Sequence, residues 1–92
     1  MRYKRKPGKV EAFVFDKDVE ITGPDWFLEA VDNGKVFLNR RIEDGAAMIY
    51  GCTIMTRTTK LRVALGDYVI RDEDGLFNKL PPSIFKRRYE RI

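Results

Sequence analysis

Residues 61–92 read LRVALGDYVIRDEDGLFNKLPPSIFKRRYERI, and this stretch decides the fold. Turn sequences divide it into three runs rich in strand-forming residues. The first turn contains Gly66-Asp67 and the second contains Asp74-Gly75, and both pairs favour tight turns between antiparallel strands. The three predicted strands are Lys60–Ala64, Tyr68–Arg71 and Leu76–Leu80.

A helical turn and a last strand are predicted at the end of the same stretch. Pro81 and Pro82 cannot donate the N–H that a strand ladder needs, so strand pairing stops there. The sequence Pro82–Phe85 suits one short helical turn, because proline fits the first helical position. Tyr89–Ile92 then predicts a terminal strand.

Ahead of this unit, Lys9–Phe15 predicts a first strand. Its side chains alternate between two faces, yet neither face is cleanly polar, since Val10 and Ala12 lie on one and Phe13 and Phe15 on the other. We therefore expect a strand that is covered on both sides for part of its length.

One helix is predicted from Pro24 to about Asp32. Thr22 is expected to cap it, proline suits its first turn, and Asn33-Gly34 is a typical C-terminal stop. The helix is too short to be stable alone, so we expect its aromatic pair Trp26-Phe27 to pack on a sheet as core. If the pair were exposed, it would instead mark a surface for a protein partner.

The middle of the chain predicts a short strand and a hairpin. Val36–Leu38 is the short strand, and residues 39–45 are expected to be an exposed loop or a fraying edge. Ala46–Thr56 and Lys60–Ala64 are strand-like runs joined by a few polar residues, which predicts a hairpin. Gly51 interrupts the first run and indicates a bulge or a break.

Together these elements predict one small α+β domain over residues 1–92. We expect a curved antiparallel sheet, or a small SH3-like barrel, of five to six strands with one helix (about residues 24–32) against it. The helical turn before the last strand is what favours barrel closure. The alternative is an open sheet with the helix across one face.

Composition limits the class of protein. The chain has 92 residues, 43% of them hydrophobic, which is ordinary for a small globular domain. Its single cysteine, Cys52, excludes an internal disulfide and fits a reducing compartment. No apolar run is long enough to span a membrane, and the basic N-terminus is not followed by the apolar segment of a secretory signal. We expect a cytoplasmic protein without a membrane partner.

The net charge of +4 is concentrated at the two ends. Residues 1–9 contain five basic residues and no acid, residues 86–92 contain four basic residues and one acid, and the remainder is acidic overall. If the termini lie close together, one basic patch results. The candidate phosphate or anion contacts are Lys4, Arg5, Lys6, Lys86, Arg87 and Arg88, with Tyr3 and Tyr89 as candidates for stacking on bases.

Catalytic and metal-binding signals are missing from the sequence. There is no histidine, and Cys52 has no nearby cysteine and lies in an apolar run, so we expect it to be core packing. The acidic run 72–74 lacks the spacing of a calcium loop, and Asp67 is expected to form a turn. No glycine-rich phosphate loop precedes a helix. We therefore expect no enzyme activity, no metal and no cofactor.

Short motifs in this chain resemble those of a family of small uncharacterised proteins from tailed phages and prophages. Members of that family open with Tyr-Arg-Lys-Lys-Pro running into Glu-Ala-Phe, and they close with Gly-Asp-Tyr-Ile-Ile, a glycine turn, Ile-Phe and Tyr-Glu. The corresponding residues in this chain are Tyr3–Pro7 and Glu11–Phe13 at the start and Gly66–Arg71, Gly75, Pro82, Ile84-Phe85 and Tyr89-Glu90 at the end. The middle of the chain also resembles the longer members of the family, in Pro24–Phe27, Ala30-Val31 and Cys52–Ile54.

The chain departs from the family pattern after the second turn. Members of the family usually continue with Gly-Glu, Phe or Tyr, and then Tyr-Pro-Cys, whereas this chain has Gly75–Leu80, and its C-terminus is more basic. The resemblance implies a phage origin, a bacterial host cytoplasm and a small β-rich fold. It implies no catalytic residues, because the family has no established activity.

Two classes of function follow from these observations. The first is a phage accessory protein that acts by binding a host protein or complex. The second is a binder of nucleic acid or of a small nucleotide through the basic termini. Retention on DNA, RNA or heparin that depends on salt would separate the two.

Overall fold

The computed structural model describes the backbone of residues 2–5 and 9–91 and the side chains of residues 10–89. Within this part of the chain there are eight strands and three helices. In chain order they are β1 (Arg2–Arg5), β2 (Lys9–Val14), α1 (Val19–Thr22), α2 (Asp25–Asp32), β3 (Val36–Glu43), β4 (Ala46–Met55), β5 (Lys60–Ala64), β6 (Tyr68–Asp72), β7 (Phe77–Leu80), α3 (Pro82–Arg88) and β8 (Tyr89–Arg91).

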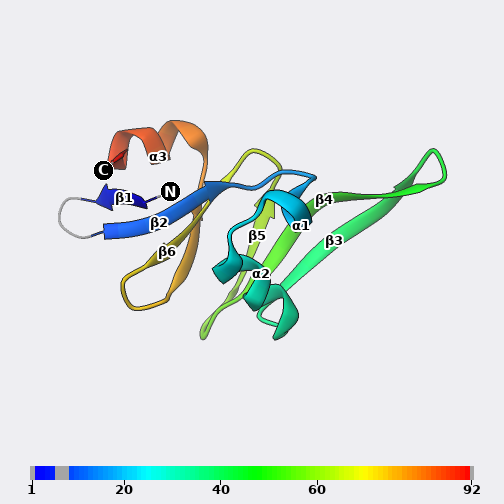
Figure 1. Ribbon diagram of the computed structural model, residues 1–92, viewed down its shortest axis with the longest axis horizontal. Coiled ribbons are helices and arrows are strands. Elements are labelled where there is room, and N and C mark those ends of the chain that lie inside the picture. The colour runs from blue at the N-terminus through cyan, green and yellow to red at the C-terminus, as the bar shows by residue number, and fades with distance from the viewer. Residues whose placement is uncertain (1, 6–8, 92) are drawn as a thin grey trace.

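The strands form two open antiparallel sheets (Figure 1). The first sheet has β7, β6 and β2 as its main strands, and the short strands β1 and β8 extend it beside β2. The second sheet has the order β3-β4-β5, and its β3–β4 hairpin projects from the body of the molecule. The α+β class is therefore confirmed.

The main core lies between the two sheets and is closed by α2. Phe27 and Ala30 of this helix are buried against Val36, Ile54 and Val63 of the second sheet. The ring of Phe27 also contacts the first sheet, since its centroid lies 4.8 Å from that of Phe13 and 6.1 Å from that of Phe15. The expected packing of α2 on a sheet is confirmed, with Phe27 fully buried and Trp26 half-buried.

A second, smaller core covers the opposite face of the first sheet. Phe85 of α3 is buried there against Val10, Ala12 and Ile70. Its ring stacks on Tyr68 at 3.9 Å and on Tyr89 at 4.9 Å between centroids. The expectation that the first long strand is covered on both faces is confirmed, because β2 contributes to both cores.

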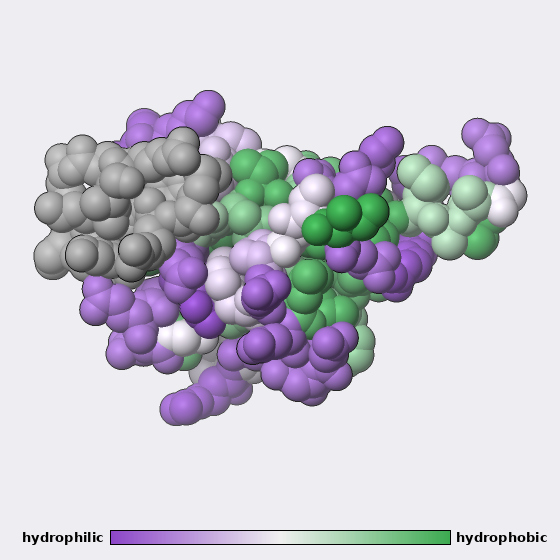
Figure 2. Space-filling view, in the orientation of Figure 1, coloured by the Kyte–Doolittle hydropathy of each residue, from purple (hydrophilic) through white to green (hydrophobic). Residues whose placement is uncertain are grey.

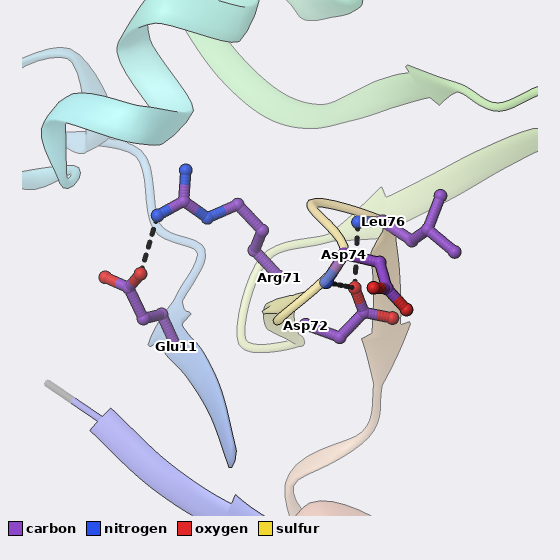
Figure 3. A network of polar contacts seen from close by, with 5 residues as sticks. All are labelled: Glu11, Arg71, Asp72, Asp74 and Leu76. Atoms are coloured by element: carbon purple, nitrogen blue, oxygen red, sulfur yellow. Dashed lines mark hydrogen bonds and ion pairs between the residues drawn. The ribbon is translucent and has the colours of Figure 1, made fainter. Parts of the chain in front are cut away.

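The predicted hairpins are also present. β4 pairs with β5 and β6 with β7, and a register shift at Gly51 marks the expected bulge. In the β6–β7 loop one carboxylate oxygen of Asp72 accepts hydrogen bonds from the N–H groups of Asp74 and Leu76, both at 2.9 Å (Figure 3). Gly75 has a φ of 79°, which glycine adopts without strain.

The expected antiparallel strands are present and the sheets are open, as in the alternative prediction, but the SH3-like barrel is wrong and the strands form two sheets rather than one. No barrel closes among the described strands, and the chain changes sheets between β5 and β6. The β5–β6 turn is bound by the end of β2, because the N–H of Phe15 donates to the C=O of Asp67 at 2.9 Å and the N–H of Gly66 donates to the C=O of Phe15 at 2.8 Å. These two bonds direct β6 to β2 rather than to β5.

The expected loop at residues 39–45 is also wrong. β3 continues to Glu43 and pairs with β4 across a two-residue turn, Asp44-Gly45. Both turn residues have positive φ, 51° and 78°, as a tight hairpin turn of this kind requires. The charged run Arg40-Arg41 hid the strand, because charges are typical both of loops and of exposed strands.

Helix details differ from the prediction in three ways. The expected cap at Thr22 is wrong, because its hydroxyl donates to the C=O of Asp18 and Pro24 precedes α2 without a side-chain hydrogen bond. The short helix α1 was not predicted, so the expectation of one helix is wrong. The C-terminal helical turn extends to Arg88, and Pro82 stands near its start as predicted.

None of the helices in the described residues is long and apolar enough to cross a membrane.

Candidate nucleic-acid interface

The outer face of the second sheet is the face turned away from the main core, and it carries the candidate site. Val36, Ile54 and Leu61 form one row across the sheet, and this row belongs to the main core. Because side chains alternate along strands, the neighbouring row of Phe37, Thr53 and Arg62 points outward.

Two aromatic rings are exposed on this outer face. Phe37 is 53% exposed and Tyr50 is 46% exposed, which is unusual for side chains of this size. Tyr50 has no partner on β3, because the register passes from Gly51 opposite Asn39 to Ile49 opposite Arg40. The bulge thus presents the Tyr50 ring at the surface.

Three cations accompany the rings. Arg41, Lys60 and Arg62 are exposed, and Lys60 and Arg62 share a face of β5. The guanidinium carbon of Arg41 lies 5.5 Å from the centroid of the Tyr50 ring, which places both side chains on one face of the sheet. The acid beside them is Glu43, whose carboxylate lies 2.7 Å from Nε of Arg41. The cations therefore outnumber this acid.

A hollow of about 490 Å³ lies on this face, beside the Tyr50 ring and the cations Lys60 and Arg62. Its polar lining includes Tyr50, Thr53, Lys60 and Arg62. Asn39 also lines it and donates a hydrogen bond from Nδ2 to the hydroxyl oxygen of Thr53 at 3.2 Å. Rings, amide, hydroxyl and cations on one open sheet can stack on bases and bind phosphates at the same time.

The structure brings the two ends of the chain together at the backbone. β1 pairs with β8 and places Lys4 opposite Glu90 and Arg5 opposite Tyr89. Lys6 lies outside the described residues, as do the side chains of Tyr3, Lys4 and Arg5. One basic patch at the ends of the chain therefore stays a prediction.

The C-terminal basic residues occupy the last turn of α3. Lys86, Arg87 and Arg88 are exposed there, where cations stabilise the negative end of a helix. Their positions thus have a structural explanation that requires no ligand. The ring of Tyr89 stacks on Phe85, so one of its faces is already covered.

The other residues considered from sequence have structural roles in the described chain. Cys52 is fully buried, and desolvation, with a smaller contribution from the Asp67 carboxylate, raises the pKa of its thiol to about 12. Asp67 accepts a hydrogen bond from the N–H of Ala64 at 3.1 Å and forms the expected turn. The described residues contain no group of three or more His, Cys, Asp or Glu side chains that could hold a metal ion.

Sequence reasoning missed the outer face of the second sheet. The available signal was the alternation of Phe37, Asn39 and Arg41, which continues the period of a strand beyond Leu38.

Comparison of the chain with protein-family models, curated proteins and solved structures finds no significant match. The resemblance to phage proteins therefore stays a prediction.

Proposed function

We propose that this protein acts by binding rather than by catalysis, and that its ligand is single-stranded nucleic acid bound on the outer face of the second sheet. The observation that carries the proposal is the presence of two exposed rings, Phe37 and Tyr50, among Arg41, Lys60 and Arg62 on one uncovered sheet face. This site is not the one expected from the sequence, which was the basic termini. The class of ligand, nucleic acid, is the same.

The chemistry of the face fits a single strand better than a duplex. Unpaired bases can stack on the rings, whereas the bases of a duplex are already stacked on one another. Arg41 covers one side of the Tyr50 ring and leaves the other available, and the hollow beside it is large enough for a base. Lys60 and Arg62, which line the hollow, and Arg41 beside the Tyr50 ring would then bind the phosphates.

Salt dependence tests this proposal. Single-stranded DNA and RNA oligonucleotides are titrated against the protein over a range of salt concentrations, with binding followed by fluorescence anisotropy. The variant Arg41→Gln/Lys60→Gln/Arg62→Gln is expected to reduce the slope of log K against log salt by about 2, at roughly 0.7 for each lost phosphate contact.

The matched control is Lys86→Gln/Arg87→Gln/Arg88→Gln, which removes the same charge from α3. It is expected to leave the slope close to that of the unmodified protein. If the α3 variant lowers the salt slope and the variant of Arg41, Lys60 and Arg62 does not, nucleic acid binds at the basic ends of the chain instead. Absence of binding to both nucleic acids at low salt would reject the proposal.

A protein partner is the second candidate, and a groove of about 970 Å³ favours it. The groove lies between the β4–β5 turn and the β6–β7 hairpin, and the edge strand β7 contributes Phe77 and Asn78 to it. An extended segment of another protein could pair with such an edge and insert apolar side chains beside Leu76, which is 59% exposed. Lys35 and Arg57, against the single acid Asp74, would favour an acidic segment.

Peptide selection tests this second candidate. A displayed library of random peptides is expected to yield extended acidic sequences that bind the protein. Leu76→Asp is expected to weaken them roughly tenfold or more, because a buried leucine contributes about 1.5–3 kcal/mol. Leu65→Asp, an exposed leucine outside the groove, is the control and should change nothing. Equal effects of the two variants would exclude the groove.

A further inference from the structure

We propose that the projecting end of β3 pairs with the same segment of a second copy of this chain. β3 is an edge strand of the second sheet, and its hairpin extends away from the body of the molecule (Figure 1). Ile42, near the tip, is 72% exposed, and Ala46 and Ala47 beside it are also exposed. Apolar surface is visible at this tip in Figure 2. Unpaired strand edges of this kind are templates for another strand.

The backbone groups of β3 determine which residues can pair. The C=O of Lys35 accepts a hydrogen bond from the N–H of Met55 at 2.8 Å, so Lys35 and every second residue after it direct their backbone groups to β4. The alternate residues Leu38, Arg40 and Ile42 therefore direct theirs to the outer edge. Val36 is only 1% exposed, so the edge is covered at that residue. The accessible edge begins near Leu38 and continues to the tip.

Charge disfavours two of the registers available to this accessible edge. Directly opposed side chains of two antiparallel strands lie on the same face of the sheet. In a two-fold dimer, a residue of one copy can therefore lie opposite only those residues of the second copy whose numbers differ from its own by an even number, so the axis passes through one residue position. Centring the axis on Arg40 or on Arg41 places identical cations opposite each other, which is unfavourable. Centring it on Ile42 places Ile42 opposite Ile42 of the second copy.

The register centred on Ile42 also satisfies the neighbouring charges. Arg41 then lies opposite Glu43 of the second copy, and Glu43 lies opposite the second Arg41. These side chains already form an ion pair within one chain at 2.7 Å, so both can exchange that partner for the equivalent one across the axis. The two isoleucine side chains, exposed in the single chain, cover each other.

The result is one continuous sheet of six strands with the order β5-β4-β3-β3-β4-β5. Because the two-fold axis is perpendicular to the sheet, both outer faces lie on the same side, and the two proposed nucleic-acid surfaces become adjacent. The contact involves only the end of each β3, so the dimer is weak and forms at high protein concentration.

Cysteine cross-linking tests the register without nucleic acid, so its outcome bears on the dimer alone. Directly opposed residues of an antiparallel pair lie about 4.5–5.5 Å apart at Cα, within the range of a disulfide. Ile42→Cys, oxidised with copper phenanthroline, is expected to form a covalent dimer. The control is Ile21→Cys, at a position that is 86% exposed, and it should form several-fold less. Cys52 is buried with a raised pKa, so it contributes no background.

The second measurement is the average mass of charge variants at residues 41 and 43, determined by sedimentation over a range of protein concentrations. These variants carry no added cysteine. Arg41→Glu is expected to abolish the increase of average mass with concentration, because it places acids opposite acids. Arg41→Glu/Glu43→Arg restores the opposed pairs with reversed charges and should restore the increase. A protein that remains monomeric at all concentrations, or equal cross-linking at positions 42 and 21, would overturn the proposal.

Discussion

Phe27→Ala is expected to lower the free energy of unfolding by about 3–5 kcal/mol, the usual cost of truncating a buried phenylalanine. Phe27 is fully buried, and its ring contacts Phe13, Phe15 and Trp26. It therefore joins α2 to the first sheet as well as to the second. A domain of this size has roughly 5–15 kcal/mol of stability in total, so the variant should be close to unfolded.

Chemical denaturation followed by the fluorescence of Trp26, the only tryptophan, measures this effect. The matched control is Phe37→Ala, which removes the same atoms from the outer face of the second sheet and should cost less than about 1 kcal/mol. Equal losses for the two variants would show that Phe37 is packed as tightly as Phe27, and the outer face would then not be open.

Phe37→Ala/Tyr50→Ala is expected to produce the largest loss of binding. Stacking of a base on an aromatic ring contributes about 1–3 kcal/mol per base, so the loss of both rings should weaken single-strand binding by at least roughly 30-fold. The salt slope should stay nearly unchanged, because the variant removes no cation. This separates the rings from Arg41, Lys60 and Arg62, whose replacement changes the slope.

The control for this variant is Phe37→Tyr/Tyr50→Phe, which keeps both rings and should bind nearly as well as the unmodified protein. Circular dichroism melting establishes that each variant is folded. If the alanine variant binds normally while folded, the rings do not stack on bases, and the proposed function loses its main support.

Elements that depend on neighbouring residues could be predicted well. The helix α2 and the turn at Asp74-Gly75 rest on proline, glycine and a local apolar stripe, all of which are visible in the sequence. Cys52 and Phe27 could also be placed in the core, because large apolar side chains and free cysteines are usually buried.

The candidate site was predicted less well than the core. The basic ends stand out in the sequence because their charges are contiguous, whereas Phe37, Tyr50 and Arg62 come from three strands. Only the registers of β3, β4 and β5 place these three residues on one face. The bulge that presents Tyr50 could be anticipated from Gly51, but its consequence for the ring could not.

By itself, the sequence determined much of the local structure of this protein: most of the strands and turns, the main helix, and which residues are apolar enough to form a core. The tertiary structure alone decided that the strands divide into two sheets. That division depends on hydrogen bonds between Phe15 and the turn at Gly66-Asp67, about 50 residues away in the chain. The need for glycine at position 51 also comes from a distant segment, because a Cβ there would lie 2.6 Å from the C=O oxygen of Val63 on the neighbouring strand. Contacts of this kind form only when distant segments meet, so no local pattern of residues encodes which face of a sheet stays open.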